Sequence, residues 1–124
     1  MITKIFQLVF LIIFISSPLF AKNRNLQEGI DLFKSKKFKE AKFKFEKNIV
    51  YNPKSELSYL YLSKIFKNLN KKNLQEQNLN TVILLNPKNE EAIFYLAKLK
   101  LEASDYKKSR ELNERLNSFC KNFC

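Results

Sequence analysis

Hydrophobic residues recur along this chain at intervals of three and four, the spacing that places them on one face of a helix. Six such stripes follow one another, and short polar segments separate them. Their apolar members are Leu26, Ile30 and Phe33; Ala41, Phe45 and Ile49; Tyr59, Leu62 and Phe66; Leu79, Val82 and Ile83; Ile93, Leu96 and Leu99; and Leu112, Leu116 and Phe119. The pattern predicts an all-α chain whose helices form three consecutive antiparallel pairs.

The chain also repeats itself. The tripeptide Asn-Pro-Lys occurs twice, with Pro53 and Pro87 at matching positions, and we call the interval between these prolines the repeat distance. The same interval aligns three small residues, Gly29, Ser63 and Ala97, which would allow two paired helices to approach closely. Proline cannot donate inside a helix but is tolerated in its first turn, so each proline can end one pair and allow the next. An unrelated helical bundle would explain the stripes but not this recurrence, which favours tandem repeats.

Two asparagines have the surroundings of helix starts. Asn73 precedes Glu76 by three residues, as in a capping box, in which each side chain satisfies a free backbone N–H. Asn89 precedes Glu90 and Glu91, whose carboxylates favour the positive end of a helix dipole. We therefore predict that each asparagine caps a helix.

The matched positions resemble the tetratricopeptide repeat, a helix–turn–helix unit of about 34 residues, which equals the repeat distance of this chain. The first unit fits best, because Gly29 and Ala41 occupy the small positions and Phe45 the large one. The third unit departs most, because Lys100 and Asn113 do not fit the pattern and Lys121 replaces the proline. The resemblance implies three tandem helix pairs over residues 22–124, stacked as a short right-handed solenoid. The expected repeats are about 22–55, 56–89 and 90–121.

Residues 1–21 are typical of an export signal. Lys4 precedes an apolar run from Ile5 to Ile15, and Ala21 suits the end of a cleaved signal. This run is shorter than the roughly 20 apolar residues that a membrane-spanning helix needs. Retention of the segment as an anchor is the alternative. We therefore expect an exported protein, either periplasmic or anchored and facing the periplasm, with membrane contact only through an uncleaved N-terminal segment.

The amino-acid composition limits the reactions and ligands that this chain can support. The chain has no histidine, so the commonest general base near neutral pH and the commonest metal ligand are both absent. No arrangement of its carboxylates, lysines or cysteines indicates a reaction. The net charge of +11 either reflects compositional drift towards lysine or favours anionic partners. We predict a non-enzymatic protein without metal or cofactor. We also predict no nucleic-acid binding, because aromatic rings that stack on bases must be exposed, whereas Phe45 lies on a predicted core stripe, and because the chain is expected to be exported.

The family resemblance implies that a protein or peptide binds the concave face, which the first helix of each pair lines. The groove-facing positions carried over from the family are Leu26, Ile30, Lys34, Leu60, Lys64, Lys67, Phe94, Lys98 and Leu101. Lysines around apolar side chains suit an acidic segment or a terminal carboxylate, although a merely solvated lysine face is the alternative. Chaperone-binding members of the family clamp the carboxylate with a set of basic and asparagine residues. In this chain, the first positions of that set are occupied by Leu26 and Ile30. That specificity is therefore not transferred.

Together these features predict a protein–protein interaction adaptor of the cell envelope. The alternative is a structural accessory protein that binds anionic lipid or glycan through its lysine-rich surface. The last predicted helix has one apolar stripe and a polar outer side, which would let it end the stack unaided. A monomer is therefore expected.

Two cysteines, Cys120 and Cys124, lie at the end of the chain. On a helix this spacing would place their Cα atoms about 6 Å apart, within the range of a disulfide. An even number of cysteines in an exported protein allows such a bond. Free thiols and links between chains are the alternatives.

Overall fold

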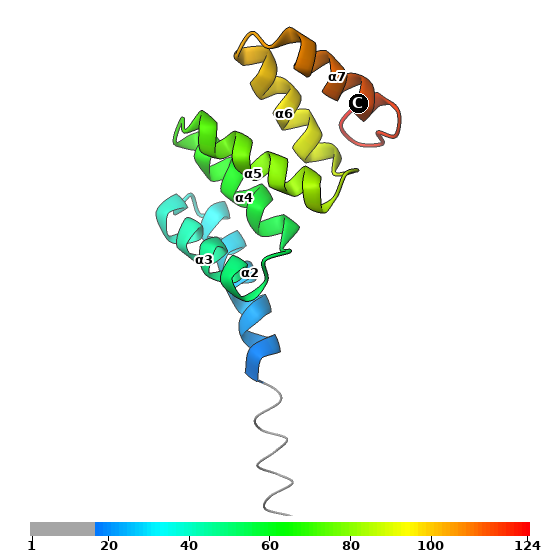
Figure 1. Cartoon of the computed structure of the whole chain (residues 1–124). Coiled ribbons are helices and arrows are strands. Elements are labelled where there is room, and N and C mark those ends of the chain that lie inside the picture. Colours follow the sequence, from blue (N-terminus) through cyan, green and yellow to red (C-terminus); the bar gives the residue numbers. More distant parts are fainter. Residues whose placement is uncertain (1–16) are drawn as a thin grey trace, which may run out of the picture.

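The computed structural model describes residues 17–124, which form six α-helices in three antiparallel pairs (Figure 1). The pairs are α2 (Ser17–Lys34) with α3 (Phe38–Tyr51), α4 (Glu56–Asn68) with α5 (Lys72–Leu85), and α6 (Glu90–Glu102) with α7 (Tyr106–Asn117). They stack in chain order, so that α2 and α3 lie at one end and α6 and α7 at the other. Within these residues there is no strand. The predicted all-α repeat architecture is confirmed.

Helix α2 begins at Ser17, ahead of residue 22, where the first repeat was expected to start. Pro18 lies in the first turn, where a backbone N–H has no partner within the helix and its loss costs little. Residues 1–16, which hold the apolar run of the predicted export signal, lie outside the described residues. Export and cleavage after Ala21 therefore stay predictions. No helix within residues 17–124 has the length and hydropathy needed to cross a membrane.

The two helices of each pair are joined by the same left-handed turn. A positive φ occurs at Lys36 (60°), Asn70 (54°) and Ser104 (61°), three residues that follow one another at the repeat distance. In the first turn the N–H of Lys37 donates to the carbonyl of Leu32 at 2.9 Å, and the other two turns have the equivalent bond. Such bonds satisfy carbonyls that the end of a helix leaves free. The repeat is therefore present in the backbone geometry as well as in the sequence.

The hydrophobic core consists of two clusters that meet at α4. One joins α2 and α3 to Leu62, Ile65 and Phe66 of α4. The other joins Leu60 of α4 to α5, α6 and α7. Because opposite faces of α4 belong to different clusters, neighbouring pairs bury their stripes against each other rather than within a pair alone.

Two asparagines fix the connection between the second and third pairs. Asn89 caps α6 by accepting the N–H of Ala92 at 2.7 Å, as its place before two glutamates predicts. Asn86 and Asn89 also donate to the carboxylate of Glu56 at the start of α4. The equivalent capping role predicted for Asn73 is wrong. Helix α5 already begins at Lys72, immediately after the left-handed turn, so Asn73 lies inside its first turn.

Candidate protein-binding groove

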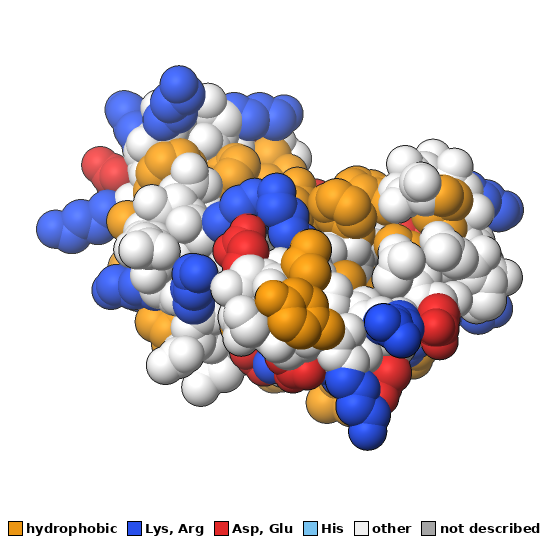
Figure 2. All heavy atoms as spheres, turned by 90° about the horizontal axis from the view of Figure 1, so that it is seen from above, with side chains coloured by type: hydrophobic (Ala, Val, Ile, Leu, Met, Phe, Trp, Pro, Cys, Tyr) orange, Lys and Arg blue, Asp and Glu red, His pale blue; other side chains and the backbone are white. Residues whose placement is uncertain are grey.

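The first helices of the three pairs, α2, α4 and α6, together line an open hollow of about 310 Å³. Its walls carry Phe33 from α2, Lys64, Lys67 and Asn68 from α4, and Tyr95 from α6, with Ser63 and Gln75 beneath. We call this set of residues the groove. Figure 2 views the molecule from the α6–α7 end and shows hydrophobic side chains between two lobes of the surface, with basic side chains nearby.

Both lysines of the groove lie near aromatic rings. The Lys64 ammonium pairs with Glu91 of α6 at 2.7 Å and lies 5.0 Å from the centre of the Tyr61 ring. The Lys67 ammonium lies 4.9 Å from the centre of the Tyr95 ring, and it forms no ion pair within residues 17–124. A cation over an aromatic face is stabilised while its charge stays accessible to a carboxylate. Lys67 is therefore the groove residue best placed to bind an anionic group.

The nine side chains that were predicted to face a partner do not all lie on one surface. Lys64 and Lys67 line the groove, and Lys34 is exposed at the end of α2. Leu26 and Ile30 are half-buried against the first core cluster, and Leu60 is 4% exposed in the second. Phe94, Lys98 and Leu101 line a different hollow, which α6 shares with α7.

Leu60 is thus a core residue, and its predicted contact with a partner is wrong. In the second pair, the position that was carried over from the family lies in the contact with the third pair, because Leu60 belongs to the core cluster that includes α6. Sequence reasoning also missed Phe33, Tyr61 and Tyr95. Tyr61 and Tyr95 are separated by the repeat distance, so a search for aromatic residues in the repeat register could have found them.

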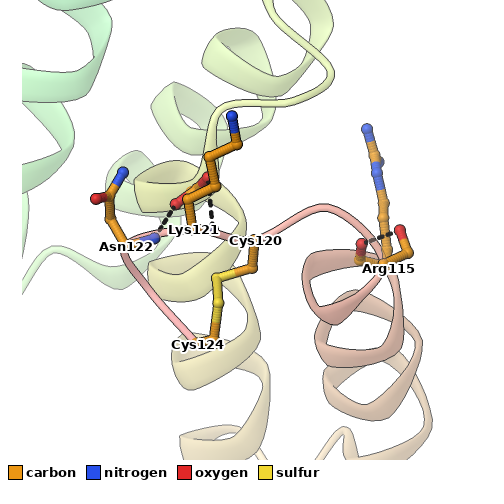
Figure 3. Close-up of a disulfide and its surroundings, with 7 residues drawn as sticks. Arg115, Cys120, Lys121, Asn122 and Cys124 are labelled. Carbon is orange, nitrogen blue, oxygen red and sulfur yellow. Dashed lines mark hydrogen bonds between the residues drawn. A yellow bond between two sulfur atoms is a disulfide. The ribbon is translucent and has the colours of Figure 1, made fainter.

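The C-terminal loop folds back onto the start of α6 (Figure 3). A disulfide joins Cys120 to Cys124, with the Cα atoms 5.7 Å apart. Their spacing suggested that the two cysteines share a helix, but α7 ends at Asn117 and both lie in the loop that follows it. The loop offers the N–H groups of Lys121 and Asn122 to the Glu90 carboxylate at 3.0 and 2.8 Å. These backbone hydrogen bonds, above all that from Asn122, lower the pKa of Glu90 below its usual value.

Among the residues that the structure describes, one other carboxyl group has a clearly shifted pKa. Hydrogen bonds from Lys44 and then Arg24 lower the pKa of Glu28, a residue of α2. The shift has an ordinary cause, since Glu28 forms surface ion pairs with both Arg24 and Lys44. Within residues 17–124, no three acidic or cysteine side chains gather closely enough to hold a metal ion.

The sequence matches no protein-family model and no curated protein. Its fold, however, is similar to solved tetratricopeptide-repeat (TPR) domains. The first TPR of Spaghetti (RPAP3), bound to the HSP90 peptide SRMEEVD, superposes with a TM-score of 0.74 at 18% identity, over 82% of this chain and 80% of that one. The TPR2B domain of yeast Sti1, in a pHsp70 complex, gives 0.73 at 15% identity, over 80% and 79%. The Arabidopsis OM64 TPR domain gives 0.73 at 18% identity, over 81% and 83%.

Proposed function

The chain has the tetratricopeptide-repeat fold, and from this fold we infer that it is a non-enzymatic adaptor that binds a segment of another protein in the groove. The observation that carries the proposal is Lys67, a cation without an ion-pair partner within residues 17–124, set on the Tyr95 ring between three parallel helices. The solved Spaghetti and Sti1 domains are complexes with an HSP90 peptide and with pHsp70, which supports a peptide-binding use of the same fold.

The chemistry of the groove favours an acidic segment with an apolar or aromatic side chain. Lys67 offers the charge, Asn68 an amide, and Phe33 and Tyr95 apolar surface. Lys64 contributes less charge than its position suggests, because Glu91 already neutralises it. Leu26 and Ile30, the positions where chaperone-binding relatives place clamp residues, hold no polar group. A terminal carboxylate therefore has fewer ligands here than in those relatives.

Two charge-reversal variants test this proposal. Lys67→Glu changes the groove, whereas Lys39→Glu makes the same change in an exposed residue of α3, away from the groove. We expect Lys67→Glu to weaken the capture of a defined partner about tenfold or more, because a carboxylate would meet a like charge at the Tyr95 ring. Lys39→Glu should leave capture unchanged. The partner is identified by photo-crosslinking from position 68 in the cell envelope, and affinities are then measured by fluorescence anisotropy.

The alternative function makes the opposite prediction. If the protein binds anionic lipid or glycan through its lysines, the two variants lose binding equally and moderate salt releases the bound material. In that case, photo-crosslinking from position 68 yields no discrete protein. This combination of results would contradict the adaptor proposal.

We further propose that the protein works outside the cytoplasm, as a periplasmic or anchored monomer. The apolar run Ile5 to Ile15 and the Cys120–Cys124 disulfide support this, since disulfides persist in oxidising compartments. Intact mass spectrometry of the chain from its own cells, without reductant, is expected to give residues 22–124 with two fewer hydrogens. A full-length oxidised chain in the membrane fraction would indicate the anchored form. A full-length chain with two free thiols in the cytosol would contradict export.

A further inference from the structure

The end of the stack that α6 and α7 form carries an exposed surface with both apolar and basic side chains. A hollow of about 610 Å³ lies between the two helices. We call the surface around it the end face and define it by Phe94, Lys98, Leu101, Tyr106, Arg110 and Asn113. Phe94 is 37%, Leu101 54% and Tyr106 63% exposed. The rings of Tyr95 and Phe123 both pack against Phe94, with ring centres 5.4 and 5.5 Å away.

The repeat register shows what this surface is. Moving each residue of the end face back by one repeat distance gives Leu60, Lys64, Lys67, Lys72, Glu76 and Leu79. These residues belong to the surface of the second pair on which α6 packs, and Leu60 and Leu79 are buried in a cluster with α6. The end face is therefore the same stacking surface one repeat further on, and no helix within residues 17–124 covers it.

The contacts of α6 on the second pair show how a covering helix is recognised. Lys64 pairs with Glu91 of α6 at 2.7 Å, and Glu76 pairs with Lys100 of α6 at 2.6 Å. Lys72 also pairs with Glu102 of α6 at 3.6 Å. Buried apolar residues of α6, such as Ala92 and Leu96, complete the contact in one core cluster with Leu60 and Leu79. Two basic side chains and one acidic side chain thus flank an apolar strip on the covered surface.

The end face keeps one of these three charges, reverses one and loses one, because the uncharged Tyr106 occupies the place of Lys72. Lys98 occupies the place of Lys64 and keeps its sign, whereas Arg110 occupies the place of Glu76 and reverses it. Neither side chain forms an ion pair within residues 17–124, and no carboxylate lines the hollow. A helix that covers this surface in the manner of α6 needs an acidic residue at both of the positions that Glu91 and Lys100 hold in α6.

A second copy of this chain does not meet these requirements. Two end faces that met each other would bring Lys98 and Arg110 against the same charges. Helix α2 of another copy could also pack on the end face, as α6 packs on the second pair. The side chains that it would then present are those that lie one repeat distance before Ser58, Tyr61 and Ile65 of α4. These are Arg24, Gln27 and Asp31, which are all polar and exposed. Such a contact would bury little apolar surface.

We propose that the end face binds an amphipathic helix of another protein, which lies on α6 and α7 as α6 lies on the second pair. The helix carries an apolar stripe over Phe94, Leu101 and Tyr106. Two carboxylates, spaced as Glu91 and Lys100 are in α6, flank this stripe and pair with Lys98 and Arg110. This site is separate from the groove and extends the stack by one helix.

Two peptides that differ at one residue test the proposal. Both have the α6 sequence of residues 89–102, stapled to hold the helix, and the second has the change Lys100→Glu. With the full oxidised chain, we expect the Glu peptide to bind about tenfold more tightly than the Lys peptide, because Arg110 attracts the carboxylate. Arg110→Glu in the protein should reverse this preference. Lys107→Glu, the same kind of change at an exposed residue of α7 outside the end face, should not. Fluorescence anisotropy measures the affinities.

A further variant examines the apolar part of the contact. Leu101→Ser, on the exposed side of α6, should weaken both peptides about tenfold, and circular dichroism should show unchanged helix content. Failure of both peptides to bind would overturn the proposal, as would a preference that Arg110→Glu does not reverse. Self-association of the chain that Leu101→Ser abolishes, detected by analytical ultracentrifugation, would assign the end face to a second copy and would overturn it too.

Discussion

Replacing Phe45 with alanine is expected to lower the free energy of unfolding by about 3–5 kcal/mol, the usual cost of truncating a buried phenylalanine. Phe45 is fully buried in the first core cluster and stacks on the Tyr61 ring of the next pair, with the ring centres 5.0 Å apart. Its removal would leave a cavity and also weaken the contact between the first two pairs. Urea unfolding followed by circular dichroism measures the loss.

A matched control lies two residues away. Phe43 is on the same helix but 61% exposed, so Phe43→Ala should change the stability by less than about 0.5 kcal/mol. Gly29 supplies a second check, because a Cβ atom there would lie 2.8 Å from Cε1 of Phe45. Gly29→Ala should therefore destabilise the natural chain but be tolerated when Phe45 is also changed to alanine. Equal losses from Phe45→Ala and Phe43→Ala would contradict the assigned core.

Much of the fold follows from features that are local in sequence. The recurrence of Pro53 as Pro87, and of Gly29 as Ser63 and Ala97, was enough to predict three stacked pairs, because each feature is a steric requirement of one backbone position. The capping role of Asn89 was predictable for the same reason. The prediction for Asn73 was wrong because its spacing to Glu76 fits a helix cap equally well. The left-handed turn at Asn70, after which α5 begins, contains no glycine that would have indicated it in the sequence.

The candidate site was less predictable, because its members depend on which face of a helix meets the next pair. Leu26, Leu60 and Phe94 occupy one register position but are half-buried, buried and exposed, respectively. The difference comes from their place in the stack, which the local pattern does not encode. The ion pair that neutralises Lys64 likewise joins residues from different repeats.

Buried polar groups are a further limit of pattern reasoning. Asn48 lies on the core side of α3 and donates to the hydroxyl groups of Ser55 and Ser58 at 2.9 and 2.8 Å. Its counterpart in the next repeat is Val82, an ordinary core residue. A polarity pattern alone places Asn48 at the surface. The two serines accept hydrogen bonds from its buried NH₂ group, whereas Oδ1 of the same amide has no hydrogen-bond partner within residues 17–124.

Ser63→Leu is the second substitution with a large expected effect, and it tests the repeat register directly. Ser63 is buried where α4 crosses α5, and its hydroxyl donates to the carbonyl of Leu60 at 2.6 Å. By the register it faces Leu79, which is fully buried, just as Gly29 faces Phe45. The larger side chain at this crossing would force α4 and α5 apart, so we expect a loss of about 1–3 kcal/mol in the free energy of unfolding, measured in urea.

Ala97→Leu is the matched control, because the same side chain is placed one repeat later. Ala97 lies beside the open hollow of the end face, and the register partner that corresponds to Leu79 there is Asn113, an exposed residue. Ala97 is 9% exposed and Ser63 is 2% exposed. The added side chain at Ala97 can extend partly into the hollow, so the loss should be smaller than for Ser63→Leu, about 1 kcal/mol or less. If Ala97→Leu cost as much as Ser63→Leu, the third pair would be as tightly closed as the second. In that case the end face would not be open to a partner helix.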